Sequence, residues 1–156
     1  MIRRIHRARM PRHARGVGLI EVMVSLVVLA VGLLGIAAMQ SMALRGGQGS
    51  LESTQAVMAT NSILEAIRAN RAQANSYNMV KTCTAPTAGG TIAGADKAAW
   101  ITSLKTTIGT AGDTTTCGQI ANCDSANATN CTITVFWDDS RAGGSTAREL
   151  RVEGQI

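Results

Sequence analysis

The sequence predicts an α+β protein, in which a long apolar N-terminal helix precedes a small domain that combines helices with an antiparallel sheet. Three observations predict this class. An uncharged apolar run extends from Val22 to Met39, an amphipathic helical pattern covers roughly residues 50–75, and two segments near the C-terminus alternate between apolar and polar residues. The chain has 156 residues, which is enough for one small domain with appendages.

The apolar run has the length of a membrane-spanning helix. Its 18 residues contain Ser25 as the only polar residue, and as a helix they extend about 27 Å, close to the hydrocarbon core of roughly 30 Å. Flanking residues extend the predicted helix to 17–44. A cleavable secretory signal is the alternative, with Ala37-Ala38-Met39 as a weak cut site. The run is longer than the usual signal core, however, and an acid, Glu21, stands at its start.

The positive charge of the chain is concentrated before the apolar run. The formal net charge is +5, yet residues 1–16 contain six arginines and no acid, and the remainder has nine basic against ten acidic residues. The folded domain therefore offers no basic face, and we expect no direct nucleic-acid binding. The same asymmetry predicts a cytoplasmic N-terminus and a C-terminus on the other side of the membrane.

The part after the apolar run reads as two helices and a hairpin. Glycines at 46, 47 and 49 disfavour helix by about 1 kcal/mol each, so we expect a break there and an amphipathic helix over roughly residues 50–75. Residues 82–95 read as loop. Asp96 is the expected N-cap of a short helix that ends at Gly109 and presents a stripe of Trp100, Leu104 and Ile108.

The C-terminal pattern is that of a β-hairpin packed on the amphipathic helix. In Thr132–Trp137 the residues Ile133, Val135 and Trp137 share one face. Arg148–Glu153 alternates in the same way, with Leu150 and Val152 directed inward, and turn residues including Gly143-Gly144 separate the two segments. A lone hairpin is marginally stable, which is why we expect it to pack on the helix.

The cysteines and histidines restrict which catalytic and metal sites the chain can form. Four cysteines, Cys83, Cys117, Cys123 and Cys131, form no C-x-x-C pair. Their even number fits two disulfides in an oxidising compartment, with three possible pairings, although free buried thiols are the alternative. Both histidines, His6 and His13, precede Gly16, so the body has no histidine for a catalytic set or a zinc site. We expect no enzyme activity, no cofactor and no metal.

The segment Arg15-Gly16-Val17-Gly18-Leu19-Ile20-Glu21-Val22 and the apolar run after it resemble the class III signal of type IV prepilins. The resemblance implies that a prepilin peptidase cuts between Gly16 and Val17 and methylates the new N-terminus of Val17. It also implies that Glu21, fifth in the mature chain, pairs with the N-terminus of a neighbouring subunit during assembly.

Further features resemble the PilV group of minor pilins, known as type IV pilus modification proteins. They are residues 18–40, the segment Ile67–Arg71, Trp100 in a short helix, and Thr132–Asp139. Two features differ from major pilins and look more like a minor pilin. Val17 stands where phenylalanine is commonest, and the apolar run lacks the proline that often kinks it, since the chain has only Pro11 and Pro86.

The resemblance implies a ladle-shaped pilin fold with three parts: a basic leader (1–16), a transmembrane and filament-core helix (17–44), and a periplasmic α+β head (45–156). It implies a minor pilin that is anchored in the inner membrane and then displayed in the pilus (fimbrium) at the cell surface. The implied partners are the prepilin peptidase, other minor and major pilins, and the inner-membrane assembly platform. The alternative is a minor pseudopilin of a type II secretion system, which shares the leader, Glu21 and the helix.

Overall fold

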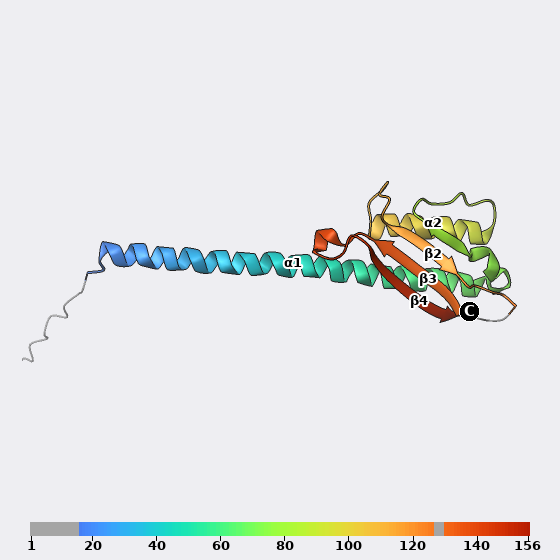
Figure 1. Cartoon of the computed structure of the whole chain (residues 1–156), viewed down its shortest axis with the longest axis horizontal. Helices are drawn as coiled ribbons and strands as arrows, with labels where there is room; N and C mark the ends of the chain where they lie inside the picture. Colours follow the sequence, from blue (N-terminus) through green and yellow to red (C-terminus); the bar gives the residue numbers. More distant parts are fainter. Residues whose placement is uncertain (1–15, 127–129) are drawn as a thin grey trace, which may run out of the picture. The chain divides into compact units, whose positions relative to one another are not determined.

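The computed structural model describes residues 16–126 and 130–156, so the predicted leader lies outside the described residues except for Gly16. The elements follow one another as α1 (Leu19–Ala69), η1 (Arg71–Tyr77), β1 (Met79–Thr82), α2 (Ile92–Thr107), β2 (Cys117–Ala121), β3 (Asn130–Trp137), η2 (Ser140–Ala142) and β4 (Arg148–Gln155) (Figure 1). They form two compact units, one up to Gln40 and one from Ser41 to Ile156. The α+β class is confirmed, because α1 packs on a small four-stranded antiparallel sheet.

The helix α1 is continuous, and the predicted break at its glycines was wrong. Gly46, Gly47 and Gly49 all lie inside α1, which also begins two residues later than expected, at Leu19, and ends at Ala69 rather than near residue 75. Once a helix is nucleated on either side, extending it through the glycines avoids the cost of a second nucleus. Residues 71–77 form the 3₁₀ helix η1 instead of the last turns of α1.

The sheet of the second unit has the order β1-β2-β3-β4, and every neighbouring pair is antiparallel. The predicted hairpin is confirmed as β3 and β4, with Ile133 opposite Val152 and Val135 opposite Leu150. The strands β1 and β2 were not predicted. The sequence gives no assignment for residues 79–81, and Cys117–Ala121 falls in a Thr-, Asn- and Gly-rich region that reads as loop. Both strands owe their conformation to pairing with strands elsewhere in the chain.

The second helix, α2, starts four residues before the predicted N-cap. Thr91 is the observed N-cap, and its hydroxyl oxygen accepts a hydrogen bond from the backbone N–H of Gly94 at 3.0 Å. Asp96 instead lies inside α2, where its carboxylate accepts the hydroxyl of Tyr77 at 2.6 Å. The predicted stripe is confirmed, since Trp100, Leu104 and Ile108 are buried.

The core lies between α1, α2 and the inner face of the sheet. The buried residues of α1 are Ala56, Thr60, Ile63, Leu64 and Ile67. The indole of Trp100 packs in this core, and its Nε1 donates to the carbonyl of Ala59 on α1 at 3.0 Å. A side chain at Gly118 of β2 would collide with the rings of Trp100, so the sheet approaches α2 closely at this glycine.

Two disulfides join the strands of the second unit. Cys83 is bonded to Cys117, which ties the end of β1 to the start of β2, and Cys123 is bonded to Cys131, which ties the loop after β2 to β3. The sequence left three pairings open, and the structure contains this one. Closing loops of 34 and 8 residues restricts the unfolded chain.

Candidate processing and assembly site

The residues that precede α1 are accessible. Residues 16–18 form neither helix nor strand, and all are exposed. An added side chain at Gly16 would meet no atom within 4 Å, and the side chain of Val17 is 70% exposed. The peptide bond between Gly16 and Val17 is therefore open to a peptidase in the described chain.

Glu21 lies in the first turn of α1. The backbone N–H groups of Glu21 and Val22 donate to the carbonyl oxygen of Gly18, at 3.0 and 3.3 Å, and so close the first turn. The positive end of the helix dipole favours a carboxylate at this position. Within residues 16–126 and 130–156 the Glu21 side chain forms no ion pair and no hydrogen bond, so its charge is available to a group from outside the chain.

Val17 and Glu21 do not yet share a helix face. A spacing of four residues places two side chains on the same side of a helix, but α1 begins at Leu19 and leaves Val17 outside it in the uncut chain. The two side chains would share a helix face only if α1 began at Val17, two residues earlier than it does. Both residues lie in the first unit, whereas the four cysteines lie in the second.

The apolar side chains of α1 up to Gln40 are exposed to solvent. Leu29 is 58% exposed and Leu34 71%, although burial of such side chains is normally strongly favourable. Among the described residues α1 is the one helix long and apolar enough to cross a membrane, with a mean hydropathy of 2.7 over its most apolar 18 residues, none of them buried. An apolar surface this large calls for a covering layer of lipid or protein.

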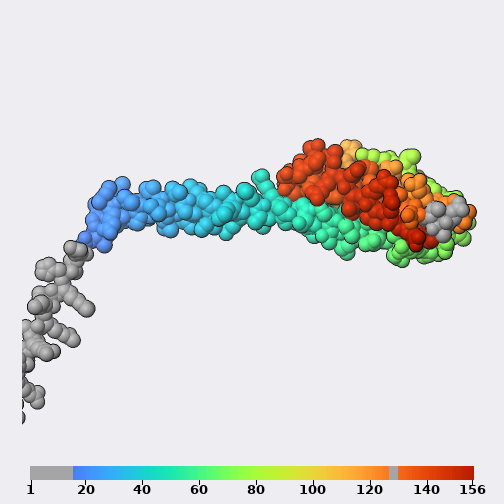
Figure 2. Space-filling view, turned by 60° about the horizontal axis from the view of Figure 1, so that its bottom comes forward, coloured from blue at the N-terminus to red at the C-terminus, as the bar shows by residue number. Residues whose placement is uncertain are grey.

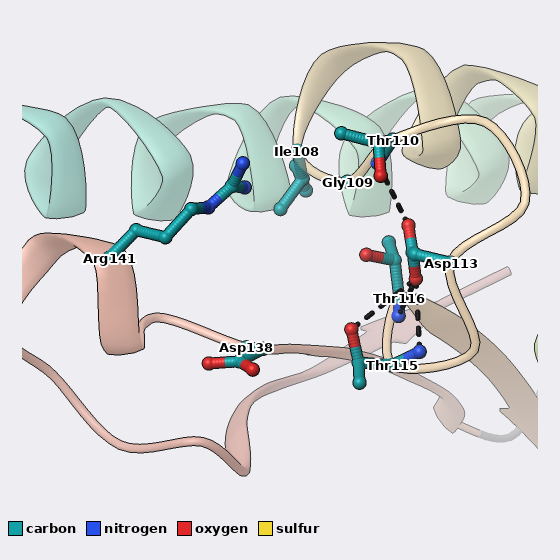
Figure 3. Close-up of a pocket in the computed structure, with 8 residues that line it drawn as sticks. All are labelled: Ile108, Gly109, Thr110, Asp113, Thr115, Thr116, Asp138 and Arg141. Carbon is teal, nitrogen blue, oxygen red and sulfur yellow. Dashed lines mark hydrogen bonds between the residues drawn. The ribbon is translucent and has the colours of Figure 1, made fainter.

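The second unit holds several cavities, and the one drawn in Figure 3 has a volume of about 150 Å³. Asp113 is the residue at this cavity that accepts several hydrogen bonds. Its carboxylate accepts the backbone N–H groups of Thr110 at 2.8 Å, Thr115 at 2.9 Å and Thr116 at 2.6 Å, and it also contacts Lys105. Burial acts to raise the pKa of Asp113, but these backbone hydrogen bonds outweigh it and hold the pKa well below the usual range.

Asp113 therefore has a structural role. Its oxygens cap backbone N–H groups of the loop between α2 and β2, and these donors already occupy them. Asp138 and Arg141 line the opposite side of the same cavity (Figure 3). Within the described part of the chain, no group of three or more histidine, cysteine or acidic side chains is arranged to hold a metal ion.

One acidic pair was missed by sequence reasoning. Glu52 of α1 and Asp139, which follows β3 and precedes η2, are both poorly exposed and lie close together in the second unit. By sequence, Asp139 belongs to the stretch of turn residues, 138–145, between the two predicted strands. The signal that could have indicated the pair is the position of Glu52, one turn before buried Ala56 on the inward face of α1.

Comparison with known proteins gives one match. The family described as "Prokaryotic N-terminal methylation motif" matches residues 11–37, which include Gly16, Val17 and Glu21. No curated protein and no solved structure shows significant similarity to the chain. The motif suggests a structural subunit rather than an enzyme, and it implies processing by a prepilin peptidase and assembly with other pilins. Together with an apolar helix that fits an inner-membrane anchor, the motif supports a type IV pilin-like protein.

Proposed function

We propose that the chain is a minor pilin of the type IV pilus. It is cut between Gly16 and Val17 by the prepilin peptidase, methylated on the nitrogen of Val17, and assembled with other minor and major pilins through the inner-membrane platform. The observation that carries the proposal is the matched motif at residues 11–37, which opens an exposed apolar helix. The four half-cystines of the second unit fit an exported head.

The apolar helix supplies the binding energy of assembly. Its exposed side chains are covered by lipid before assembly and by neighbouring apolar helices afterwards, which keeps them out of water in both states. The arginines of the leader hold the N-terminus in the cytoplasm, so the second unit is placed in the periplasm.

Glu21 sets the axial register of the subunit. Removal of the leader creates an ammonium group on Val17, and an isolated charge among packed apolar helices is costly. The carboxylate of Glu21, which forms no ion pair with any described residue of its own chain, pairs with the ammonium of a neighbouring subunit. A subunit that slips along the filament would leave both charges unpaired.

The test replaces Glu21 by Ala and by Asp and measures incorporation into sheared pili by immunoblot. We expect Glu21→Ala to insert in the membrane and to be cleaved like wild type, but to be depleted from filaments, with Glu21→Asp intermediate because its arm is shorter. Glu65→Ala is the matched control, since Glu65 is an exposed acid of the same helix in the second unit. Equal incorporation of Glu21→Ala and wild type would contradict the proposed pairing.

A minor pseudopilin of a type II secretion system shares the leader, Glu21 and α1, so these features do not separate the two functions. The cysteine-rich region 117–131 and the segment Ile67–Arg71 favour the pilus. Deleting the gene separates them further. We expect fewer pili with unchanged protein secretion, whereas a loss of secretion with normal pili would favour the pseudopilin.

A further inference from the structure

The connection between β3 and β4 lies on α1 within the second unit. The two strands and η2, coloured orange to dark red, run along the teal and green part of α1 in Figures 1 and 2. The connection and α1 both line a cavity of about 420 Å³, to which α1 contributes small residues that include Gly46, Gly49 and Ser53. A Cβ atom at Gly49 would stand 3.2 Å from Oδ1 of Asp139, so the connection approaches the backbone of α1 closely here.

Asp139 is a buried carboxylate in this connection. The residue is 1% exposed, and its Oδ2 accepts Nη1 of Arg148 from β4 at 2.5 Å. Its backbone N–H donates to the carbonyl of Ser145 at 3.0 Å, and its carbonyl accepts the N–H of Gly144 at 2.9 Å. These bonds fix the position of Asp139 and present its other oxygen, Oδ1, to α1.

Glu52 approaches the same place from α1. Its side chain is 15% exposed, and its Oε1 lies 3.9 Å from Nη2 of Arg141, which is too long for a hydrogen bond. Burial raises the pKa of Glu52, and the negative charge of Asp139 raises it further, while Arg141 lowers it. The side chain is therefore held near a second carboxylate in a poorly hydrated position.

Three buried polar atoms at this contact have no hydrogen-bond partner in the structure: Oε2 of Glu52, Oδ1 of Asp139 and Nε1 of Trp137. Leaving buried polar atoms unpaired destabilises the folded state. Two are acceptors when both acids are ionised, and the only donor among the three is the indole N–H, so one more hydrogen is needed to pair them all.

We propose that Glu52 and Asp139 share one proton, and that this proton fastens the β3–β4 connection to α1. The protonated Glu52 carboxyl donates to Oδ1 of Asp139 and accepts the indole N–H of Trp137, which satisfies all three atoms. Asp139 stays ionised and keeps its ion pair with Arg148.

The charges that face the pair favour a proton over a metal ion. Arg148 from β4 and Arg141 from η2 already bring two positive charges, and the indole N–H of Trp137 cannot ligate a cation. Asp138 is the remaining ionisable neighbour. It is only partly exposed, and its carboxylate accepts the N–H of Ser140 and interacts with Arg141 rather than with Glu52.

The shared proton makes the contact sensitive to pH in a definite direction. The folded-state pKa of Glu52 lies above its ordinary value of 4.5, so its contribution to stability is complete below 4.5 and is lost as pH rises through the folded-state value. Loss of the proton leaves two carboxylates side by side, and the β3–β4 connection separates from α1.

The test compares wild type with Glu52→Gln as full chains in detergent micelles, with thermal unfolding measured from pH 4 to pH 8. The glutamine amide can donate to Asp139 and accept from Trp137 at every pH, as protonated Glu52 does. We expect equal Tm values at pH 4 and a wild-type Tm lower by roughly 2–8 °C at pH 8. The matched control Glu65→Gln, at an exposed acid of α1, should follow wild type throughout.

Infrared spectroscopy supplies an independent readout. The C=O band of a protonated carboxyl should persist in wild type above pH 4.5, titrate away at higher pH, and be missing from Glu52→Gln. A Tm difference that does not change with pH, or a band that titrates at or below pH 4.5, would overturn the proposal. A gap at pH 8 that calcium closes and chelator restores would also overturn it, because the occupant would then be a cation.

Discussion

The two units of the chain differ in where their apolar side chains lie. Up to Gln40 the apolar residues of α1 are exposed, as Leu29 illustrates at 58%. In the second unit α1 also has exposed apolar residues, such as Met42 and Met58, but it buries one face in a closed core, where Ile67 and Ile133 of β3 are fully buried. The first unit therefore depends on lipid or other subunits for its stability, whereas the second unit is stabilised by its own core and disulfides.

The largest effect is expected from a pair of substitutions that tests this difference between the two units. Ile133→Ala removes a buried side chain from the core of the second unit and should lower its free energy of unfolding by about 2–5 kcal/mol. Leu29→Ala, at an exposed position, should change it by less than about 0.5 kcal/mol. Chemical unfolding followed by circular dichroism compares the two variants, and similar losses would contradict the division into a dependent and a self-supporting unit.

The next prediction concerns how much each disulfide contributes to the stability of the second unit. Replacing Cys83 and Cys117 together by alanine should cost about 2–4 kcal/mol. Replacing Cys123 and Cys131 should cost roughly 1 kcal/mol less from loop entropy, because this bridge closes 8 residues rather than 34. Unfolding in urea measures both. Four thiols that react with an alkylating reagent in the unreduced, unfolded protein would contradict the pairing altogether.

A smaller effect is expected at Asp113, which is outside the core. Asp113→Asn removes the charge that accepts three backbone N–H groups, and should lower the stability at pH 7 by about 1–3 kcal/mol. The pKa of Asp113 is lowered by folding, so its contribution is present above 3.8 and is lost as pH falls below that value. Unfolding curves at pH 7 and pH 3 should show the difference shrinking in acid, and an undiminished difference would contradict the cap.

The periodicity of apolar residues was enough to predict the elements that need only some apolar surface to pack against. The apolar run, the stripe of Trp100, Leu104 and Ile108, and the hairpin faces depend only on periodicity. The strands β1 and β2 could not be predicted in this way, because Met79–Thr82 and Cys117–Ala121 become strands by pairing with distant segments. The Thr91 cap was missed because Asp96 is the better capping residue by type.

The residues of the candidate site were likewise predictable where they are close in sequence and unpredictable where they are far apart. Gly16, Val17 and Glu21 are close in sequence, so a resemblance over one short segment carried the prediction, and the methylation motif matches the same segment. The Glu52–Asp139 contact joins α1 to the β3–β4 connection, and no spacing rule relates residues so far apart in the sequence. Aspartate is also common in exposed turns, so the burial of Asp139 could not be predicted from the sequence.

The most direct test of the proposed function is the intact mass of the protein recovered from sheared filaments, because one number reports processing, methylation and disulfide formation. We predict the mass of residues 17–156 with one added methyl group and four hydrogens removed by the two disulfides. A chain that retains residues 1–16, or one that begins after Met39, would contradict cleavage at Gly16 and with it the minor-pilin assignment.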